Sequence, residues 1–496
     1  MPAHFGQPLR ILRQEKLSGA VLSVAVTIPL LISLLLVSQL DYDEILTILE
    51  ISFLAFLCAI PFFKERVREV TNPVLSVSML YFIMFCLGSL YVLLYPESFN
   101  RLGYNAGLDL TALNKGLSFS ILCFLFFLFG YYAFDYSKLA AALTGRAIKS
   151  IPNIHKFELS IRRLPLVIVV LLLIGWLSRL FLIEIGAYYF VGAGRSDLIN
   201  TDYAYLAQFL GFGSLFPLLA LSIVYSEYLK NKRIALLWVT ILILASEMAF
   251  NFPIGSKAKA ILPIFILLII YSIKKKTPFK LFIIASIIFI FFIFPLINTY
   301  RLNYTGDVFF DLMEGFKIYW KSFFGSNKSM VGEVLFSVFG ERLNYASIVG
   351  VIVDNTPSVS DFKFGSTYIL FFPSLIPRVL WPGKPSVSFA NEFGRDYGFL
   401  HPLDESTSVG MTWIGEMFIN FGWFGIFVPL IYGFLYRFIF LYFFRNGKPN
   451  TLGTVVYAFT LQTIIVGDTF AGWFSGLLRF YFILLVAFLP FVTRHK

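Results

Sequence analysis

Ionisable side chains gather in one stretch late in the chain, between Phe364 and Gly425. Prolines and glycines are frequent in the same stretch, and they fix turns on which side chains can be held in place. Clustered cations and carboxylates on fixed turns are what a binding or catalytic site needs, although an ordinary solvated loop has a similar composition. The ionisable residues are Arg378, Lys384, Glu392, Arg395, Asp396, His401, Asp404, Glu405 and Glu416.

Histidine and cysteine are poorly placed for holding a metal ion. The 4 histidines are far apart in the sequence. The 3 cysteines lie in apolar runs, where a thiol packs as a small hydrophobic group. We therefore expect no metal, no cofactor and no disulfide. The residues are His4, His155, His401, His495, Cys58, Cys86 and Cys123.

Composition places most of the chain in a lipid bilayer. Of 496 residues, 58% are hydrophobic, 19% are aromatic and only 14% are charged, whereas soluble proteins carry roughly 25% charged residues. The net charge of +11 does not indicate a nucleic-acid partner, because the basic residues lie between apolar runs rather than together on a polar face. We therefore predict an integral membrane protein that contacts membrane lipids.

Apolar runs long enough to cross a hydrocarbon core of ~30 Å recur along the chain. The first run, 17–38, follows basic residues and exceeds the apolar core of a signal peptide, so we expect an uncleaved span. No repeat or soluble segment divides the chain, and we predict a single all-α membrane domain, 1–496, with about twelve spans. The runs are 17–38, 45–63, 74–95, 116–134, 164–182, 206–225, 234–250, 258–273, 281–297, 423–444, 452–466 and 477–492.

Basic residues in alternate gaps between these runs indicate the orientation. Cytoplasmic loops carry an excess of lysine and arginine, and the other gaps are acidic or mixed, beginning with Asp41, Asp43 and Glu44. Both termini are therefore predicted to be cytoplasmic. The basic gaps are 64–68, 138–163, 230–233, 274–280, 445–448 and 494–496.

One gap, 298–421, is much longer than the others and is extracytoplasmic in this topology. Loops beyond ~12–15 residues are usually functional or disordered, and the abundance of aromatic and aliphatic residues argues against disorder. Within it, 330–353 has the pattern of an interfacial helix, because charged residues interrupt an apolar run. The run 364–381 contains Pro373 and Pro377, and we predict a re-entrant or surface element there.

Ionisable residues also occur within or at the ends of the predicted spans. Such residues are costly in lipid, so they usually face a cavity or a partner. We expect Asp468 and Arg479 to pair near the extracytoplasmic end of the last hairpin. The residues of this kind are Glu50, Glu247, Arg437, Asp468 and Arg479.

Motifs between Phe364 and Gly425 resemble those of a known family. They are PRVLWPGKP at 377–385, NEFG at 391–394, Gly415-Glu416, and NFG at 420–422 with Gly425. They are similar to motifs of the oligosaccharide repeat-unit polymerases of bacterial surface polysaccharide synthesis, the Wzy-type or O-antigen polymerases. The number of spans and the large late external loop resemble that family as well.

The resemblance implies a membrane glycosyltransferase of GT-C-like architecture in the bacterial inner membrane, with its active site on the extracytoplasmic face. Such enzymes polymerise undecaprenyl-pyrophosphate-linked oligosaccharide repeat units into O-antigen, capsule or exopolysaccharide. A chain-length regulator and a flippase are the protein partners that the resemblance implies.

The same resemblance implies three sets of site residues. Cations would hold the pyrophosphate as its charge grows, a carboxylate or imidazole would take the acceptor proton, and aromatic faces would hold sugars. The pyrophosphate candidates are Arg378, Lys384, Arg395, Arg195 and Lys257, with Arg301 and Arg479 as weaker ones. The proton-acceptor candidates are Glu416, Glu392, Asp396 and His401, and the sugar candidates are Trp381, Trp413 and Tyr368.

Alternatives remain for these residues and for the function. Basic residues near span ends also reach lipid headgroups, and aromatic residues also form interfacial belts. A flippase or transporter of lipid-linked oligosaccharides would often show an internal repeat, which we do not find. An O-antigen ligase uses the same donor with a different acceptor, and His401 with Arg395 is compatible with that activity.

Overall fold

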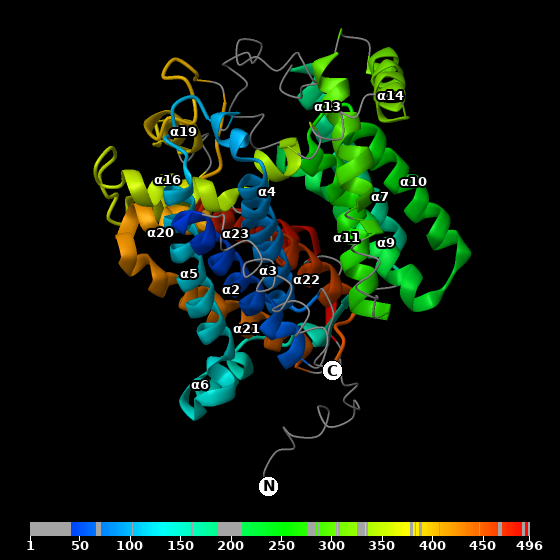
Figure 1. The fold of residues 1–496 in the computed structure, drawn as a ribbon. Helices are drawn as coiled ribbons and strands as arrows, with labels where there is room; N and C mark the ends of the chain where they lie inside the picture. Colours follow the sequence, from blue (N-terminus) through cyan, green and yellow to red (C-terminus); the bar gives the residue numbers. More distant parts are fainter. Residues whose placement is uncertain are drawn as a thin grey trace.

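The structure, a computed structural model, is built almost entirely of helices (Figure 1). A two-stranded antiparallel sheet pairs β1 (Phe157–Leu159) with β2 (Val492–Arg494). The residues described are 41–65, 71–101, 103–159, 162–185, 211–275, 284–285, 287–303, 305, 308–324, 333, 336–376, 380–381, 383–385, 389–405, 407–445, 447–464, 469–488 and 492–494.

Polar residues begin several of the long apolar helices. The Asn72 Oδ1 accepts from the Val74 N–H at 3.3 Å where α3 (Pro73–Tyr81) starts. The Asp109 Oδ1 accepts from the Ala112 N–H at 2.7 Å at the start of α5 (Leu110–Tyr136). Side-chain oxygens of this kind satisfy backbone donors that a helix leaves free at its first turn, so they fix where each helix begins.

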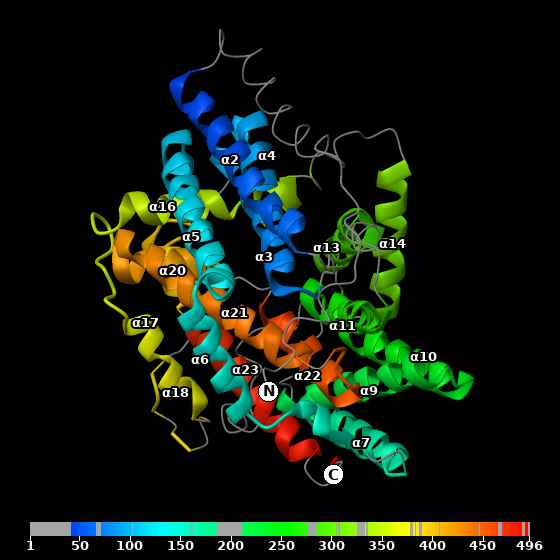
Figure 2. The same cartoon turned by 90° about the horizontal axis from the view of Figure 1, so that it is seen from below.

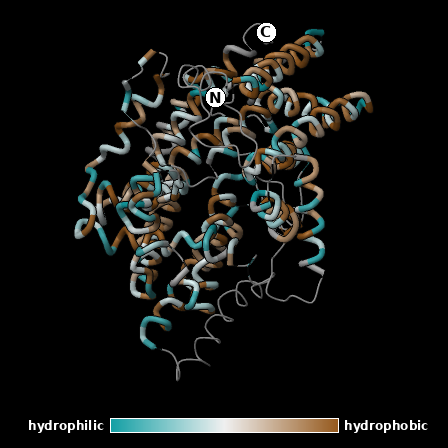
Figure 3. Tube along the Cα trace, turned by 90° about the horizontal axis from the view of Figure 1, so that it is seen from above, coloured by the Kyte–Doolittle hydropathy of each residue, from teal (hydrophilic) through white to brown (hydrophobic). Residues whose placement is uncertain are grey.

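Among the described residues, 6 helical runs are long and apolar enough to cross a membrane. Hydrophobic residues extend along these and the neighbouring helices (Figure 3). The chain is therefore an all-α polytopic membrane protein, while a total of about twelve spans stays a prediction and the first predicted span, 17–38, lies outside the described residues. The 6 runs are α2 (Tyr42–Lys64), α3 through η1 (Phe82–Leu87) to α4 (Gly88–Leu94), α5, α7 (Leu164–Glu184), α10 (Ile234–Asn251), and α20 (Thr412–Phe421) through η9 (Gly422–Phe427) to α21 (Val428–Phe444).

Helix α5 is the centre of one group of helices, and glycines let its neighbours approach closely. A Cβ at Gly130 would lie 2.0 Å from the Leu430 carbonyl oxygen of α21, and one at Gly433 would lie 2.1 Å from that of Phe127. On α16 (Tyr345–Asn355), a Cβ at Gly350 would lie 2.0 Å from the Ala112 oxygen of α5. Small residues at such contacts are typical of helix packing in membranes.

A second group consists of α7, α9 (Phe216–Asn231), α10 and α11 (Lys257–Lys275), which pack on one another. Helix α22 (Thr451–Ile464) contacts α9 and α11 of this group as well as α3 and α23 (Phe470–Phe488) of the first. Thr451 on α22 donates from its hydroxyl to the buried Glu227 carboxylate on α9. Helix α22 therefore joins the two groups (Figure 2).

The described residues of the long segment 298–421 include several helices joined by turns. Much of it, including α19 (Ala390–Asp396) and α14 (Val308–Phe324), lies at one end of the molecule, and the basic helix α6 (Lys138–Ser150) lies at the other (Figure 1). The run 364–381 contains the short helices α17 (Ser366–Ile369) and α18 (Phe371–Leu375), which pack against α23. In the run 330–353, α16 is largely buried against α5 and α20.

An ion pair is buried between α7 and α10. The Arg179 guanidinium donates to both oxygens of the Glu247 carboxylate, at 2.6 and 2.9 Å, and the two side chains are 1% and 2% exposed. Glu247, expected to face a partner, therefore has one on a neighbouring helix. A bidentate pair satisfies both charges where water cannot, which is what a bilayer interior requires.

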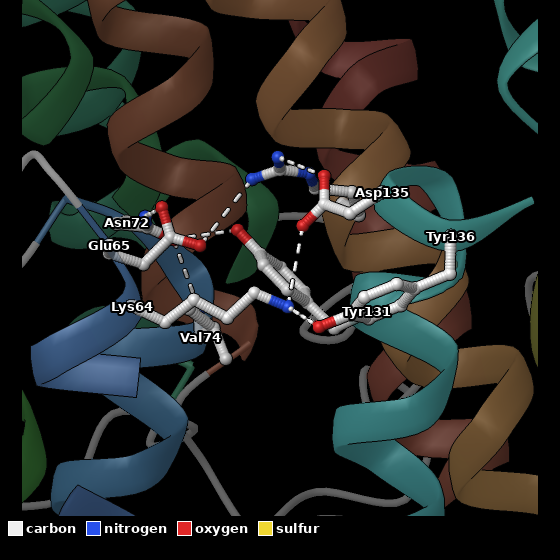
Figure 4. Close-up of polar contacts among 8 residues, drawn as sticks. Lys64, Glu65, Asn72, Val74, Tyr131, Asp135 and Tyr136 are labelled. Atoms are coloured by element: carbon white, nitrogen blue, oxygen red, sulfur yellow. Dashed lines mark hydrogen bonds and ion pairs between the residues drawn. The ribbon is translucent and has the colours of Figure 1, made fainter. Parts of the chain in front are cut away.

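Arg437 of α21 also has partners, at the same end as α6. Its guanidinium lies 3.6 Å from the Glu65 carboxylate and 3.5 Å from that of Asp135. Lys64, Asp135 and Tyr136 are joined there as well, with the lysine Nζ donating to the tyrosine hydroxyl at 2.8 Å (Figure 4). This network links α2, α5 and α21.

Candidate functional site

Helix α19 carries three candidate residues close together. Glu392 and Asp396 are exposed, and the Glu392 carboxylate lies 3.9 Å from the Lys363 ammonium. The Nε of Arg395 is buried and has no hydrogen-bond partner among the described residues. Buried Phe393 fixes the helix on the molecule, so α19 presents two accessible carboxylates at a defined position.

His401 lies in the loop that follows α19. Its Nδ1 accepts from the Leu403 N–H at 3.1 Å, and its exposed ring meets the edge of Tyr104 at 4.8 Å between centroids. The loop is held on the segment before α5, because the Asn105 N–H donates to the Gly398 oxygen at 2.7 Å. His401 and the two carboxylates of α19 are thus exposed on α19 and the loop that follows it.

Glu416 is 0% exposed and sits inside the protein. The Thr367 hydroxyl donates to one of its oxygens at 2.7 Å, and the Phe470 backbone N–H donates to the other at 2.6 Å. Phe470 begins α23, so the carboxylate lies at a helix amino terminus, where negative charge is stabilised. Both oxygens are therefore engaged in joining α20 to α17 and α23.

Asn420 completes this clamp one helical turn after Glu416. Its side-chain N–H groups donate to the Thr367 hydroxyl at 2.8 Å and to the Glu416 backbone oxygen at 2.7 Å. Its Oδ1 accepts from the Gly365 N–H at 2.8 Å. Gly422 follows with a φ of 55° and a ψ of −140°, a conformation that suits glycine and ends α20. The motif from Gly415 to Gly422 thus builds a joint between helices.

Lys384 is 6% exposed, with its ammonium directed at the end of α18. Its Nζ donates to the Ile376 oxygen at 2.8 Å and approaches the Pro373 oxygen at 3.4 Å. A cation at the carboxyl end of a helix satisfies carbonyls that have no partner within the helix. In this structure the lysine caps the carboxyl end of α18.

The three sugar candidates lie in different surroundings. Trp381 is 41% exposed and accessible. Trp413 is packed between Tyr81, at 6.0 Å, and Tyr432, at 5.5 Å between ring centroids. Tyr368 stacks on Phe470 at 4.9 Å, and its hydroxyl is buried without a hydrogen-bond partner in the described part of the chain.

Lys257 forms a cation cluster with two arginines from separate segments. It begins α11, just before the predicted span 258–273, while Arg301 is in the last turn of α13 (Phe294–Leu302) and Arg342 is in the turn before α16. Burial, then the charges of Arg342 and Arg301, lower the pKa of the Lys257 ammonium to about 7, against the opposite effect of Glu341. Its Nζ lies 3.5 Å from the Phe294 ring centroid.

The positive charges around Lys257 outweigh the opposing effect of Glu341, and a bound anion would relieve their repulsion. Arg342 had no assigned role in the sequence interpretation, although it interrupts an apolar run together with Glu341. These two charged residues in an apolar run were the sequence signal that could have identified Arg342 as a candidate. Its convergence with Lys257 depends on chain packing, which the local sequence does not encode.

Other candidates lie outside the described residues. They are Arg378 and Arg195, and also Asp468, the expected partner of Arg479. The Arg479 guanidinium donates to the Ser475 hydroxyl at 2.7 Å. Within the described residues, no three His, Cys, Asp or Glu side chains lie together as metal ligands would.

The fold defines the class of protein, which is a polytopic helical membrane protein. A family model described as O-antigen polysaccharide polymerase Wzy matches residues 20–495. The chain therefore belongs to the Wzy family of O-antigen polysaccharide polymerases, as its motifs predicted. Comparisons with curated proteins and with solved structures gave no significant match.

Proposed function

We propose that this protein is a membrane glycosyltransferase that lengthens a surface polysaccharide from undecaprenyl-pyrophosphate-linked repeat units. The match of the polymerase family over residues 20–495 carries this proposal, since it spans nearly the whole chain. In the reaction, the bond between the donor sugar and the pyrophosphate breaks. A new glycosidic bond forms to a hydroxyl of the acceptor unit, and that hydroxyl gives its proton to a base.

The lipid pyrophosphate leaves with increasing negative charge, so it needs cations fixed beforehand. Lys257, Arg301 and Arg342 are assigned this role, because the two arginines, from separate segments, are near enough to Lys257 for their charges to lower the pKa of its ammonium group. Arg395 is a further candidate, since its buried Nε lacks a partner among the described residues. Arg378 and Arg195 stay candidates on their sequence context.

The base is assigned to the exposed group of Glu392, Asp396 and His401. A proton acceptor must come within hydrogen-bond reach of a sugar hydroxyl, and these side chains are accessible. Glu416 is assigned a positioning role, because both of its oxygens already accept hydrogen bonds inside the protein. Trp381 is the favoured sugar-stacking residue, being more accessible than Trp413 and Tyr368.

The site is proposed to lie on the extracytoplasmic face of the bacterial inner membrane, and the pattern of basic residues supports this proposal. The end that carries α6 is assigned to the cytoplasm, and the end that carries α19 to the opposite side (Figure 1). Lipid-linked substrates would reach such a site from the outer leaflet. A chain-length regulator and a flippase are the proposed protein partners.

Reconstitution of the purified protein with lipid-linked repeat units tests the function. We expect a ladder of longer lipid-linked glycans. Movement of the substrate across the bilayer without lengthening would indicate a flippase, and transfer to a different lipid would indicate a ligase. Arg342→Ala should shorten the ladder, while Arg233→Ala, in a basic gap at the α6 end, should leave it unchanged.

A further inference from the structure

One face of helix α14 attaches it to neighbouring described residues. The Thr305 N–H and hydroxyl donate to the Asp311 carboxylate at 2.8 and 2.7 Å. A Cβ at Gly315 would lie 3.2 Å from the Tyr300 backbone, and the Tyr319 hydroxyl donates to the Phe291 oxygen. Asp311, Gly315 and Tyr319 follow one another at intervals of four residues, so they lie on one face of the helix. That face contacts Thr305, Tyr300 and Phe291.

A different face of α14 is apolar and exposed. Phe309 is 77% exposed, Met313 47%, Phe316 45% and Trp320 48%. Their spacing of four, three and four residues places them in one stripe along the helix. We call these four residues the aromatic stripe. Exposed apolar stripes of this length mark an interaction surface.

Three observations favour a lipid bilayer as the partner of the aromatic stripe. Helix α14 runs crosswise to the apolar helix α11, since Figure 1 shows α14 nearly end-on and Figure 2 shows it side-on. The charged residues Glu314, Lys317 and Lys321 lie beside the stripe, as on helices that lie at a membrane surface. Phenylalanine and tryptophan are suited to the interface between headgroups and acyl chains.

Helix α14 is also attached to a run whose exposed residues are expected to face lipid. The bond from Tyr319 brings α14 against the helical run that includes η7 (Phe289–Ile293). Ile287 and Ile288 of that run are 49% and 46% exposed and belong to the predicted span 281–297. A crosswise helix with an exposed apolar stripe, attached to a predicted span that has exposed apolar residues of its own, is the arrangement of an interfacial anchor.

We propose that α14 is an interfacial anchor whose aromatic stripe inserts into the outer leaflet of the membrane, with Lys317 and Lys321 at the level of the lipid phosphates. The helix follows α13 after a few residues, and α13 carries Arg301 in its last turn. Anchoring α14 therefore holds Arg301, and with it Lys257 and Arg342, at headgroup depth. A diphosphate attached to a lipid lies at the same depth in the membrane.

Depth-dependent quenching tests the anchor without reference to catalysis. Phe316→Cys in the full-length protein is labelled with an environment-sensitive fluorophore and reconstituted in phosphatidylethanolamine and phosphatidylglycerol vesicles. Glu314→Cys, on the charged face of the same helix, is the matched control. The native cysteines Cys58, Cys86 and Cys123 are buried, so the introduced thiol is the one labelled.

We expect the label at 316 to be quenched by nitroxide lipids and shielded from aqueous iodide, with the reverse for the label at 314. Equal quenching of both labels by iodide would overturn the proposal. Shielding of 316 from both quenchers would also overturn it, because the stripe would then be covered by protein. Phe309→Cys repeats the measurement at a more exposed position if the first variant is not monodisperse.

Discussion

Lys257 keeps its ammonium group in surroundings that disfavour its charge. Partial burial and the neighbouring Arg342 and Arg301 lower its pKa to about 7, so the side chain is charged below that pH and increasingly neutral above it. A bound anion would oppose this loss of charge. The residue thus couples the strength of the proposed pyrophosphate site to pH in the physiological range.

We predict that the KM for the lipid-linked donor rises as the pH increases through 7, by about tenfold, equivalent to ~1.4 kcal/mol, when the cation is lost. Lys257→Arg should remove much of this dependence, since a guanidinium stays protonated. Initial rates of ladder formation between pH 6 and 9 measure the effect. Identical pH profiles for the two proteins would exclude Lys257 from the site.

Substitutions of Glu416 distinguish a role in joining helices from a role in accepting the acceptor proton. Glu416→Gln keeps one oxygen for the Phe470 N–H and an amide that can donate to the Thr367 hydroxyl, so we predict a folded protein with reduced but measurable polymerisation. Glu416→Ala removes both contacts and should lower the yield of folded protein. Glu405→Gln, at an exposed carboxylate of the same loop, serves as the control.

The measurements are monodispersity in detergent and the rate of ladder formation. A Glu416→Gln protein that folds normally and loses ~10²–10⁴-fold in rate would instead identify Glu416 as the general base.

At the scale of elements, glycines determine how α5 meets its neighbours. Gly130 faces the α21 backbone at a distance that leaves no room for a side chain, whereas a Cβ at Gly145 on α6 would contact nothing within 4 Å. We predict that Gly130→Ala lowers stability by about 1–3 kcal/mol through overpacking. Gly145→Ala should be neutral or slightly stabilising, because alanine favours helices more than glycine does.

Thermal unfolding of the two variants in the same detergent makes this comparison direct. Equal midpoints would show that α5 and α21 adjust without cost, and that the close contact is not needed for stability.

Hydropathy alone predicted most of the helices, because lipid imposes one length and one kind of surface on every span. Helices α2, α5, α7 and α10 fall where apolar runs placed them. The contacts between helices could not be predicted from hydropathy, because they depend on residues far apart in the sequence. Glu416 accepts from the Phe470 N–H, and Glu247 pairs with Arg179, which is the one charged residue of its predicted run, 164–182.

The candidate site was predictable to a similar degree. Motifs identified the family, and residue types predicted a site in the segment that carries α19, which stays a prediction. They did not separate Lys384 and Glu416, whose contacts are internal, from exposed Glu392 and His401, because burial is decided by the packing of α17, α18, α20 and α23. Arg342 was overlooked for the same reason.

At the scale of the whole molecule, the α6 end and the α19 end are predicted to lie on opposite sides of the membrane, and this sidedness can be measured. We predict that His401→Cys is labelled by an impermeant maleimide added outside intact cells. Gly145→Cys, on α6, should be labelled only after the inner membrane is opened. The reverse pattern would place the α19 end in the cytoplasm and remove the basis for a lipid-linked donor in the outer leaflet.

The wedging of α5 between α16 and α21 has a mechanical consequence. Main chain meets main chain at Gly130, Gly350 and Gly433, so these helices cannot slide without overlap. The group of α7, α9, α10 and α11 meets them through α22, where side-chain contacts such as Thr451 with Glu227 allow small rotations. A product that lengthens at every cycle needs an opening of changing width, and we expect that opening to form where this second group pivots on α22.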